Sequence, residues 1–165
     1  MTDALTILQA KQDISDVVFA YGYALDNRDW DRLRSCFTPD VVGRYGGEPI
    51  EGYEGIEAMC RATLEPMAVS QHLIGNVVVT IDADDLDRAA SVCYLHAQHV
   101  RPGTEGGEQF IFAGRYLDRL VRTAEGWRIA GRTLEAMWTS GNPAMIARPL
   151  RTLAGSQPVV TPPAS

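Results

Sequence analysis

Apolar residues in the first 67 positions recur at helical spacing. Over residues 5–25 they fall at steps of three and four, as in Ile14, Val17, Val18, Tyr21 and Leu25. This spacing predicts an amphipathic helix with one buried face. Shorter helices are predicted over residues 29–37 and 53–67, with a short strand over 41–45 between them.

The pattern changes after residue 67 from helical spacing to long β-rich runs. Four strands are predicted over residues 70–81, 88–101, 109–123 and 127–138. The turns between them are short enough for antiparallel neighbours. Helices followed by a meander indicate an α+β domain over 1–138, in which a curved antiparallel sheet wraps around the N-terminal helices. The proline-rich stretch 139–165 is expected to form an irregular tail.

Composition narrows the class of protein. The 165 residues are 45% hydrophobic and carry a net charge of −6, which fits one globular domain and argues against a nucleic-acid partner. No run of 18 apolar residues and no leader-like segment is present, so we expect neither a membrane partner nor export. The three cysteines form no CxxC pair, which fits a reducing cytoplasm and indicates neither disulfides nor a zinc site.

Asp26 and His72 are the candidate catalytic pair. Asp26 lies at the end of the first predicted helix, and His72 opens the first long strand. A histidine that accepts a proton at neutral pH works best beside a carboxylate, which fixes its tautomer and stabilises the imidazolium. The pair needs neither a metal nor a cofactor for this chemistry.

Several local strings, in this order, resemble the SnoaL-like branch of the nuclear transport factor two superfamily. The strings are YALDNRDW at 23–30, CFTPD at 36–40, QH at 71–72, Asn76, GRYLD at 114–118 and GWRI at 126–129. The resemblance covers about residues 5–138 and implies a cone-shaped α+β fold. The fold hosts several activities and also non-catalytic members, so the reaction must be argued from the site.

Within this superfamily the chain is similar to cofactor-free lyases of the scytalone dehydratase and bile-acid 7α-dehydratase type. The resemblance implies that Asp26 orients His72 and that His72 abstracts a proton. It implies a catalytic tyrosine at Tyr21, although a position five residues before Asp26 is about 140° away around a helix. Tyr23 is the rival by geometry. The resemblance also implies a second pocket histidine at His99.

Other residues are candidates for substrate binding. Strand alternation puts Asn76 on the same face as His72, and it puts His96 and His99 on opposite faces, without deciding which faces inward. For that reason the three histidines are not expected to converge on a metal ion. The further candidates for substrate binding are Tyr45, Arg115 and Trp138.

These features predict a cofactor-independent lyase of the dehydratase type. The expected substrate is a small hydrophobic cyclic molecule with a carbonyl, steroid-like or polyketide-like. An isomerase or cyclase that uses the same two residues is the alternative, as is a non-catalytic ligand-binding domain. We also expect a homo-dimer or homo-trimer, because the outer sheet face, with Leu73, Val77 and Val79, would otherwise expose an apolar patch.

Overall fold

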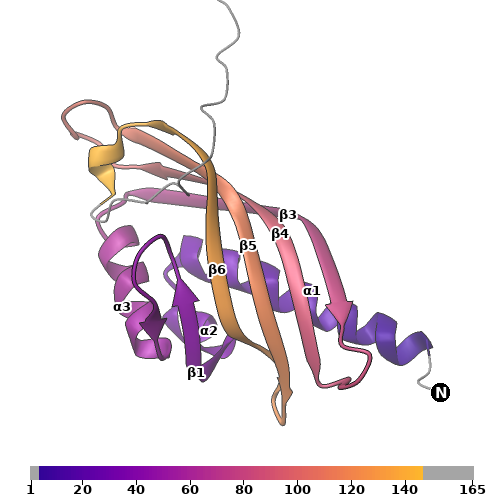
Figure 1. Ribbon diagram of the computed structural model, residues 1–165. Coiled ribbons are helices and arrows are strands. Elements are labelled where there is room, and N and C mark those ends of the chain that lie inside the picture. The colour runs from indigo at the N-terminus through magenta and orange to yellow at the C-terminus, as the bar shows by residue number, and fades with distance from the viewer. Residues whose placement is uncertain (1–3, 147–165) are drawn as a thin grey trace, which may run out of the picture.

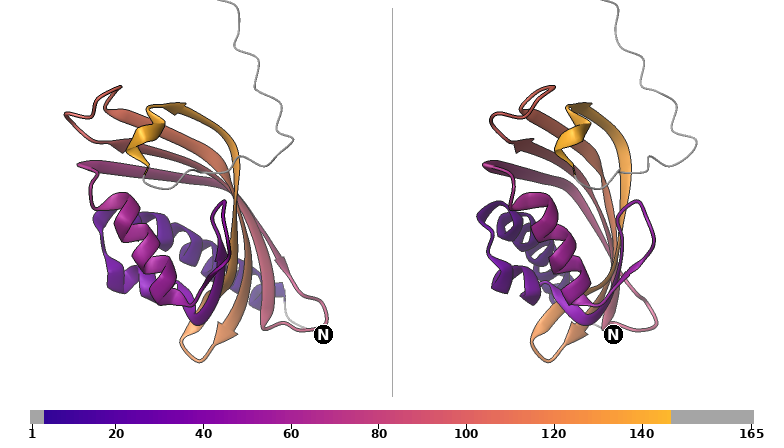
Figure 2. Two further views of the ribbon diagram at one scale, coloured as in Figure 1. Left: turned by 60° about the vertical axis from the view of Figure 1, so that its left-hand side comes forward. Right: turned by 90° about the vertical axis from the view of Figure 1, so that its left-hand side faces the viewer.

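The computed structural model describes residues 4–146. One curved six-stranded sheet forms a layer, and three helices lie against its concave side (Figure 1). Two turned views show the sheet curling over the helices (Figure 2). The predicted α+β cone, a curved sheet around N-terminal helices, is therefore confirmed. Among the described residues, no helix is both long and apolar enough to cross a membrane.

The helices follow the predicted apolar spacing. Helix α1 covers Ala4–Asn27 and buries Ile14, Val18, Tyr21 and Leu25 on one face. Helix α2 covers Trp30–Ser35, and helix α3 covers Tyr53–Leu64. Both are shorter than predicted. The Asp29 side chain caps α2 by accepting the Arg32 N–H, so that helix begins one residue later than expected.

The sheet has the strand order β2-β1-β6-β5-β4-β3. Its strands are β1 (Phe37–Arg44), β2 (Ile50–Glu51), β3 (Val69–Ile81), β4 (Arg88–Val100), β5 (Gln109–Thr123) and β6 (Gly126–Gly141). Strands β3 to β6 form the predicted antiparallel meander. The expectation of a wholly antiparallel sheet is wrong in one place, because β1 pairs in parallel with β6. The outer edge of β6 is otherwise unpaired, and β1 supplies its backbone partners.

A β-bulge interrupts β3 at Asn76. The pairing register with β4 shifts between Gly75 and Val78, and Asn76 has a φ of 51°. A bulge adds one residue to a strand, so side chains beyond it change faces. Asn76 is consequently exposed rather than on the His72 face, and Val77 and Val79 pack against the core rather than outward. Both strand-face predictions were wrong for this reason.

Strand β6 runs past the predicted domain boundary at residue 138. It continues to Gly141, and a 3₁₀ turn over Pro143–Met145 follows it. Asn142 anchors this turn, because its side-chain amide donates to the carbonyls of Glu105 and Gly107. Residues 147–165 of the predicted tail lie outside the described residues.

A buried ion pair lies in the core between β5 and β6. Asp118 and Arg132 face each other in the strand register and form two hydrogen bonds of 2.7 and 2.6 Å, and both side chains are fully buried. The guanidinium also lies 4.0 Å from the ring centroids of Tyr21 and Tyr116. Burial alone would lower the pKa of Arg132, but Asp118 and the tyrosines raise it well above its ordinary value. The charge is therefore retained inside the core.

We expect Asp118→Asn to destabilise the protein by about 3–5 kcal/mol, because it leaves the Arg132 charge buried without its counter-ion. Urea denaturation followed by tryptophan fluorescence measures the free energy of unfolding. Asp118→Leu combined with Arg132→Met is the matched control and should retain more stability than the single variant, because no charge remains buried. A loss below about 1 kcal/mol in Asp118→Asn would contradict this account.

Candidate functional site

A cavity of about 90 Å³ opens between α1, α3 and the concave face of the sheet. Most of its wall is apolar, from side chains that include Leu25, Met59, Leu95, Phe110, Phe112 and Leu134. A few polar groups converge on it, namely His72, His99, Thr63 and the tyrosines at 21, 45 and 116. An apolar cavity with few polar groups is typical of a small-molecule site.

Asp26 binds His72 through both carboxylate oxygens. Oδ1 lies 2.6 Å from the ring Nδ1, and Oδ2 accepts the His72 backbone N–H at 2.9 Å. That backbone group is available because β3 is an edge strand. The His72 side chain is 5% exposed and that of Asp26 is 23% exposed. Asp26 therefore occupies Nδ1–H and leaves the Nε2 lone pair of His72 for the cavity.

Arg28 closes the end of α1 beside this pair. The Asp29 N–H donates to the Ala24 carbonyl and the Arg28 N–H to the Leu25 carbonyl, which is the Schellman pattern of a helix C-terminus. Arg28 itself has a φ of 56°, in the left-handed region that glycine favours. Its guanidinium donates to the carbonyls of Leu25 and Leu64 at 2.6 and 2.7 Å. These bonds to the ends of two helices offset the backbone strain.

His99 lies beside His72 on the cavity wall, on the neighbouring strand β4. The two ring centroids are 5.6 Å apart. Nδ1 of His99 lies 3.3 Å from Oγ of Ser70, the residue directly opposite it on β3. Burial, followed by the nearby His72 and Arg28, lowers the pKa of His99 to about 4. His99 is therefore neutral at physiological pH.

Three tyrosines form the far wall of the cavity. Burial raises the pKa of Tyr21, Tyr45 and Tyr116, although Arg132 partly opposes the rise in each case. All three phenols are therefore protonated hydrogen-bond donors. The buried Tyr45 hydroxyl has no hydrogen-bond partner within residues 4–146.

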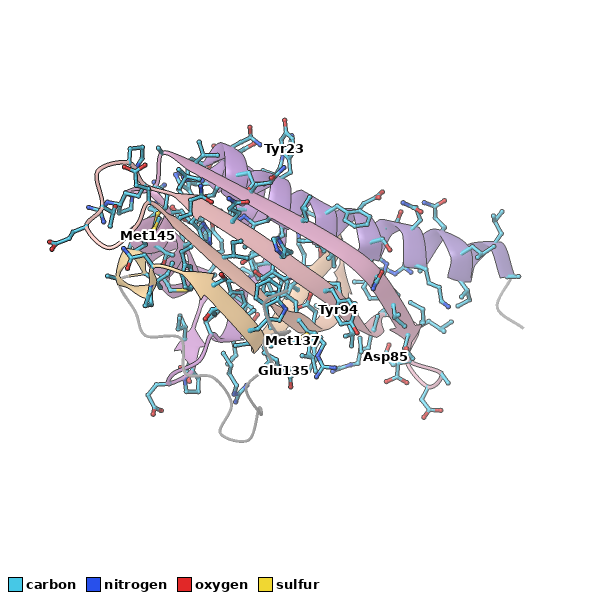
Figure 3. The ribbon with its side chains drawn as sticks, turned by 90° about the horizontal axis from the view of Figure 1, so that it is seen from above. Tyr23, Asp85, Tyr94, Glu135, Met137 and Met145 are labelled. Carbon is cyan, nitrogen blue, oxygen red and sulfur yellow. The ribbon has the colours of Figure 1, made fainter. Side chains whose placement is uncertain are left out.

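The structure brings together most, but not all, of the predicted site residues. Asp26 and His72 meet as expected, and Tyr21, Tyr45 and His99 share their cavity. The rival tyrosine, Tyr23, is 57% exposed and points outward from α1 (Figure 3).

Three predicted site residues lie elsewhere, on the outside of the sheet. Asn76 was displaced by the bulge, as described above. Arg115 is exposed and paired with Glu135 at 2.5 Å, because residue 115 alternates with the inward-facing Tyr116. Trp138 is 40% exposed and packs against His96 on the outer face. The prediction that these residues line the pocket was wrong.

Three residues at the site, Arg28, Ser70 and Tyr116, were not predicted from the sequence. Ser70 and Tyr116 could have been placed by strand alternation, because Ser70 precedes His72 by two residues and Tyr116 alternates with Arg115. Arg28 carried no such signal, because its role depends on where the end of α3 packs.

The three histidines do not converge. His96 contacts Trp138 outside the sheet, whereas His72 and His99 face the cavity. Within the part of the chain that is described, no three His, Cys, Asp or Glu side chains are grouped to hold a metal ion.

Two curated proteins are similar over most of the chain. The terrestric acid biosynthesis cluster protein E of Penicillium crustosum is 30% identical over 146 residues, which is 86% of this chain and 92% of the relative. A scytalone dehydratase-like protein of Passalora fulva is 23% identical over 77% of this chain and 85% of its own length.

Solved structures share the fold at low sequence identity. A scytalone dehydratase candidate from Novosphingobium aromaticivorans superposes with a TM-score of 0.79 at 20% identity, covering 94% of this chain and all of that one. A nuclear transport factor 2-like protein from Salmonella enterica superposes with a TM-score of 0.70 at 17% identity, covering 79% of this chain and 92% of that one. The SnoaL-like domain family model matches residues 6–133. Because this match covers most of the chain, the protein belongs to the SnoaL-like domain family.

Proposed function

We propose that this protein is a cofactor-independent lyase that removes water from a small hydrophobic carbonyl compound. The observation that carries the proposal is the Asp26–His72 pair, whose imidazole lies on the wall of an apolar cavity. Similarity to a scytalone dehydratase-like protein supports a role of the lyase or isomerase type.

The proposed reaction begins with His72 as the base. Its Nε2 takes a proton from the carbon next to the substrate carbonyl, and the C–H electrons form an enolate. Asp26 stabilises the imidazolium through Nδ1–H. The enolate then reforms the carbonyl and expels the hydroxyl group from the neighbouring carbon, forming a C=C bond. The imidazolium returns its proton to that oxygen, so water leaves and His72 is regenerated.

The three cavity tyrosines, Tyr21, Tyr45 and Tyr116, would stabilise the negative charge of the enolate. The unpartnered Tyr45 hydroxyl would donate to the enolate oxygen as negative charge develops on it. Tyr21 and Tyr116 line the same wall, and the Arg132 cation lies over their rings. These neutral phenol donors would stabilise the negative charge on the enolate oxygen.

The cavity wall supports a compact apolar substrate. Its aromatic and aliphatic side chains suit a cyclic ring system, and its few donors suit one or two oxygen atoms. Of the arginines in the last two strands considered for a substrate carboxylate, Arg115 faces outward and Arg132 is paired with Asp118, so neither is free to bind one. Neutral polyketide-like or steroid-like compounds fit these constraints.

Two alternatives use the same cavity. An isomerase or cyclase would also begin with proton abstraction by His72, and would differ in where the enolate is reprotonated or which bond it forms. A ligand-binding domain would use the same donors without turnover. The outcome of a substrate screen separates these alternatives.

We expect His72→Gln to lower the turnover of any accepted substrate by about 10²–10⁴-fold, because it removes the base and keeps the side chain polar. A panel of cyclic β-hydroxy ketones, followed by mass spectrometry for loss of water, provides the assay. Asp26→Asn should also lower turnover, because an amide cannot stabilise the imidazolium.

The matched control is His96→Gln, which removes a histidine from the outer face and should leave turnover unchanged. Turnover retained by folded His72→Gln would show that another group is the base. Tight binding without turnover across the panel would favour the ligand-binding alternative.

We also propose that a second copy of this chain covers the outer sheet face. Large apolar side chains remain exposed there, including Leu73, Val78, Val92, Tyr94, Met137 and Trp138. Tyr94 and Met137 lie close together on the face turned to the viewer in Figure 3. Both residues line a shallow groove on this face with Leu73 and Trp138. A patch of this kind is typical of a protein–protein contact.

Light scattering at micromolar concentration should give the mass of a dimer or trimer. Tyr94→Glu should shift the mass toward the monomer, because it places a charge within the apolar patch. Tyr23→Glu, an exposed tyrosine on α1, is the matched control and should not change the mass. A monomeric wild-type protein would overturn the proposal.

A further inference from the structure

The two cavity histidines differ in the partner of Nδ1. Nδ1 of His72 faces a carboxylate, which can only accept a hydrogen bond when ionised. Nδ1 of His99 faces the hydroxyl of Ser70, which can either donate or accept. The protonation of His99 therefore depends on what else Ser70 binds.

Arg28 decides the orientation of the Ser70 hydroxyl. Arg28 Nη2 lies 3.1 Å from Ser70 Oγ, and a guanidinium has donors but no acceptor. Ser70 Oγ must therefore accept from Arg28. Across the described residues, the only other hydrogen-bond contact of that buried oxygen is Nδ1 of His99. The hydroxyl hydrogen is satisfied only if it is donated to this nitrogen.

The guanidinium is not free to release Ser70. It is also bound to the carbonyls of Leu25 and Leu64 at the ends of α1 and α3. The left-handed backbone at Arg28 directs the side chain back across these helix ends. The hydrogen bonds from Arg28 to Ser70 and from Ser70 to His99 therefore depend on how α1 ends.

The groups around His99 also favour its neutral form. The groups that influence His99 are His72 from β3, Arg28 just after α1 and Asp26 from α1. Burial, His72 and Arg28 all disfavour a proton on Nδ1 in addition to the one on Nε2, and Asp26 opposes them only in part.

We infer that Arg28 and Ser70 are positioning residues that hold His99 as the neutral tautomer with its proton on Nε2. His99 then presents an N–H donor to the cavity, whereas His72 presents a lone pair to it. If the proposed function holds, His99 donates a hydrogen bond to the substrate oxygen that gains charge, without transferring a proton. The two imidazoles thus have opposite roles, set by a carboxylate behind one and a hydroxyl behind the other.

Nitrogen-15 NMR of histidine-labelled protein tests the tautomer without any substrate. The chain has three histidines, and His72→Gln, His96→Gln and His99→Gln assign their signals. In the wild type at pH 5.5 to 7.5 we expect His99 to be neutral, with Nδ1 unprotonated and Nε2 protonated. Ser70→Ala should remove the preference for one tautomer, so that the chemical shifts of Nδ1 and Nε2 of His99 move toward each other.

Ser91→Ala is the matched control, because Ser91 is a buried serine of β4 whose hydroxyl has no partner among the described residues. It should leave the His99 spectrum unchanged, and Ser70→Thr should restore it by keeping a hydroxyl. A wild-type His99 protonated on Nδ1, or a Ser70→Ala spectrum identical to that of the wild type, would overturn the inference. Failure of the His72 assay with the expected spectrum would instead reject only the proposed function.

Discussion

The carboxylate of Asp26 holds helix α1 against the edge strand β3 and orients His72 at the same time. One oxygen satisfies a backbone N–H that the edge strand leaves unpaired, and the other binds the imidazole. An acidic residue in the last turn of a helix is unfavourable next to the negative end of the helix dipole. Here the Arg28 cation and the His72 donors offset that cost. The geometry of the Asp26–His72 pair and the docking of the first helix therefore depend on one carboxylate.

A buried ion pair supports another part of the cavity wall. Arg132 and Asp118 are fully buried and hold each other, and the guanidinium contacts the rings of Tyr21 and Tyr116. A buried ion pair contributes little net stability, because desolvation of both charges opposes their attraction. In this core the pair holds the Arg132 guanidinium against the rings of two tyrosines that line the cavity.

The strained Arg28 links the ends of α1 and α3 to the His99 side of the cavity. A non-glycine residue with a positive φ costs of order 1 kcal/mol, and it persists only where its side chain makes compensating contacts. Those contacts reach the ends of α1 and α3 and the Ser70 hydroxyl beside His99. The Arg28 side chain thus couples the end of α1, the packing of α1 against α3 and the tautomer of His99.

The sequence by itself determined the elements, the α+β class and the central pair. Helical and strand periodicities are local properties, and the strings around Asp26 and His72 carried the family resemblance, so the pairing could be predicted. The tertiary structure decided what depends on register and on contacts between distant segments. A single bulge at Asn76 reversed the faces of the β3 residues that follow it. Arg28 acquired its role from the place where α3 ends. A one-residue shift in a strand moves every later side chain to the opposite face, and short-range patterns do not record it.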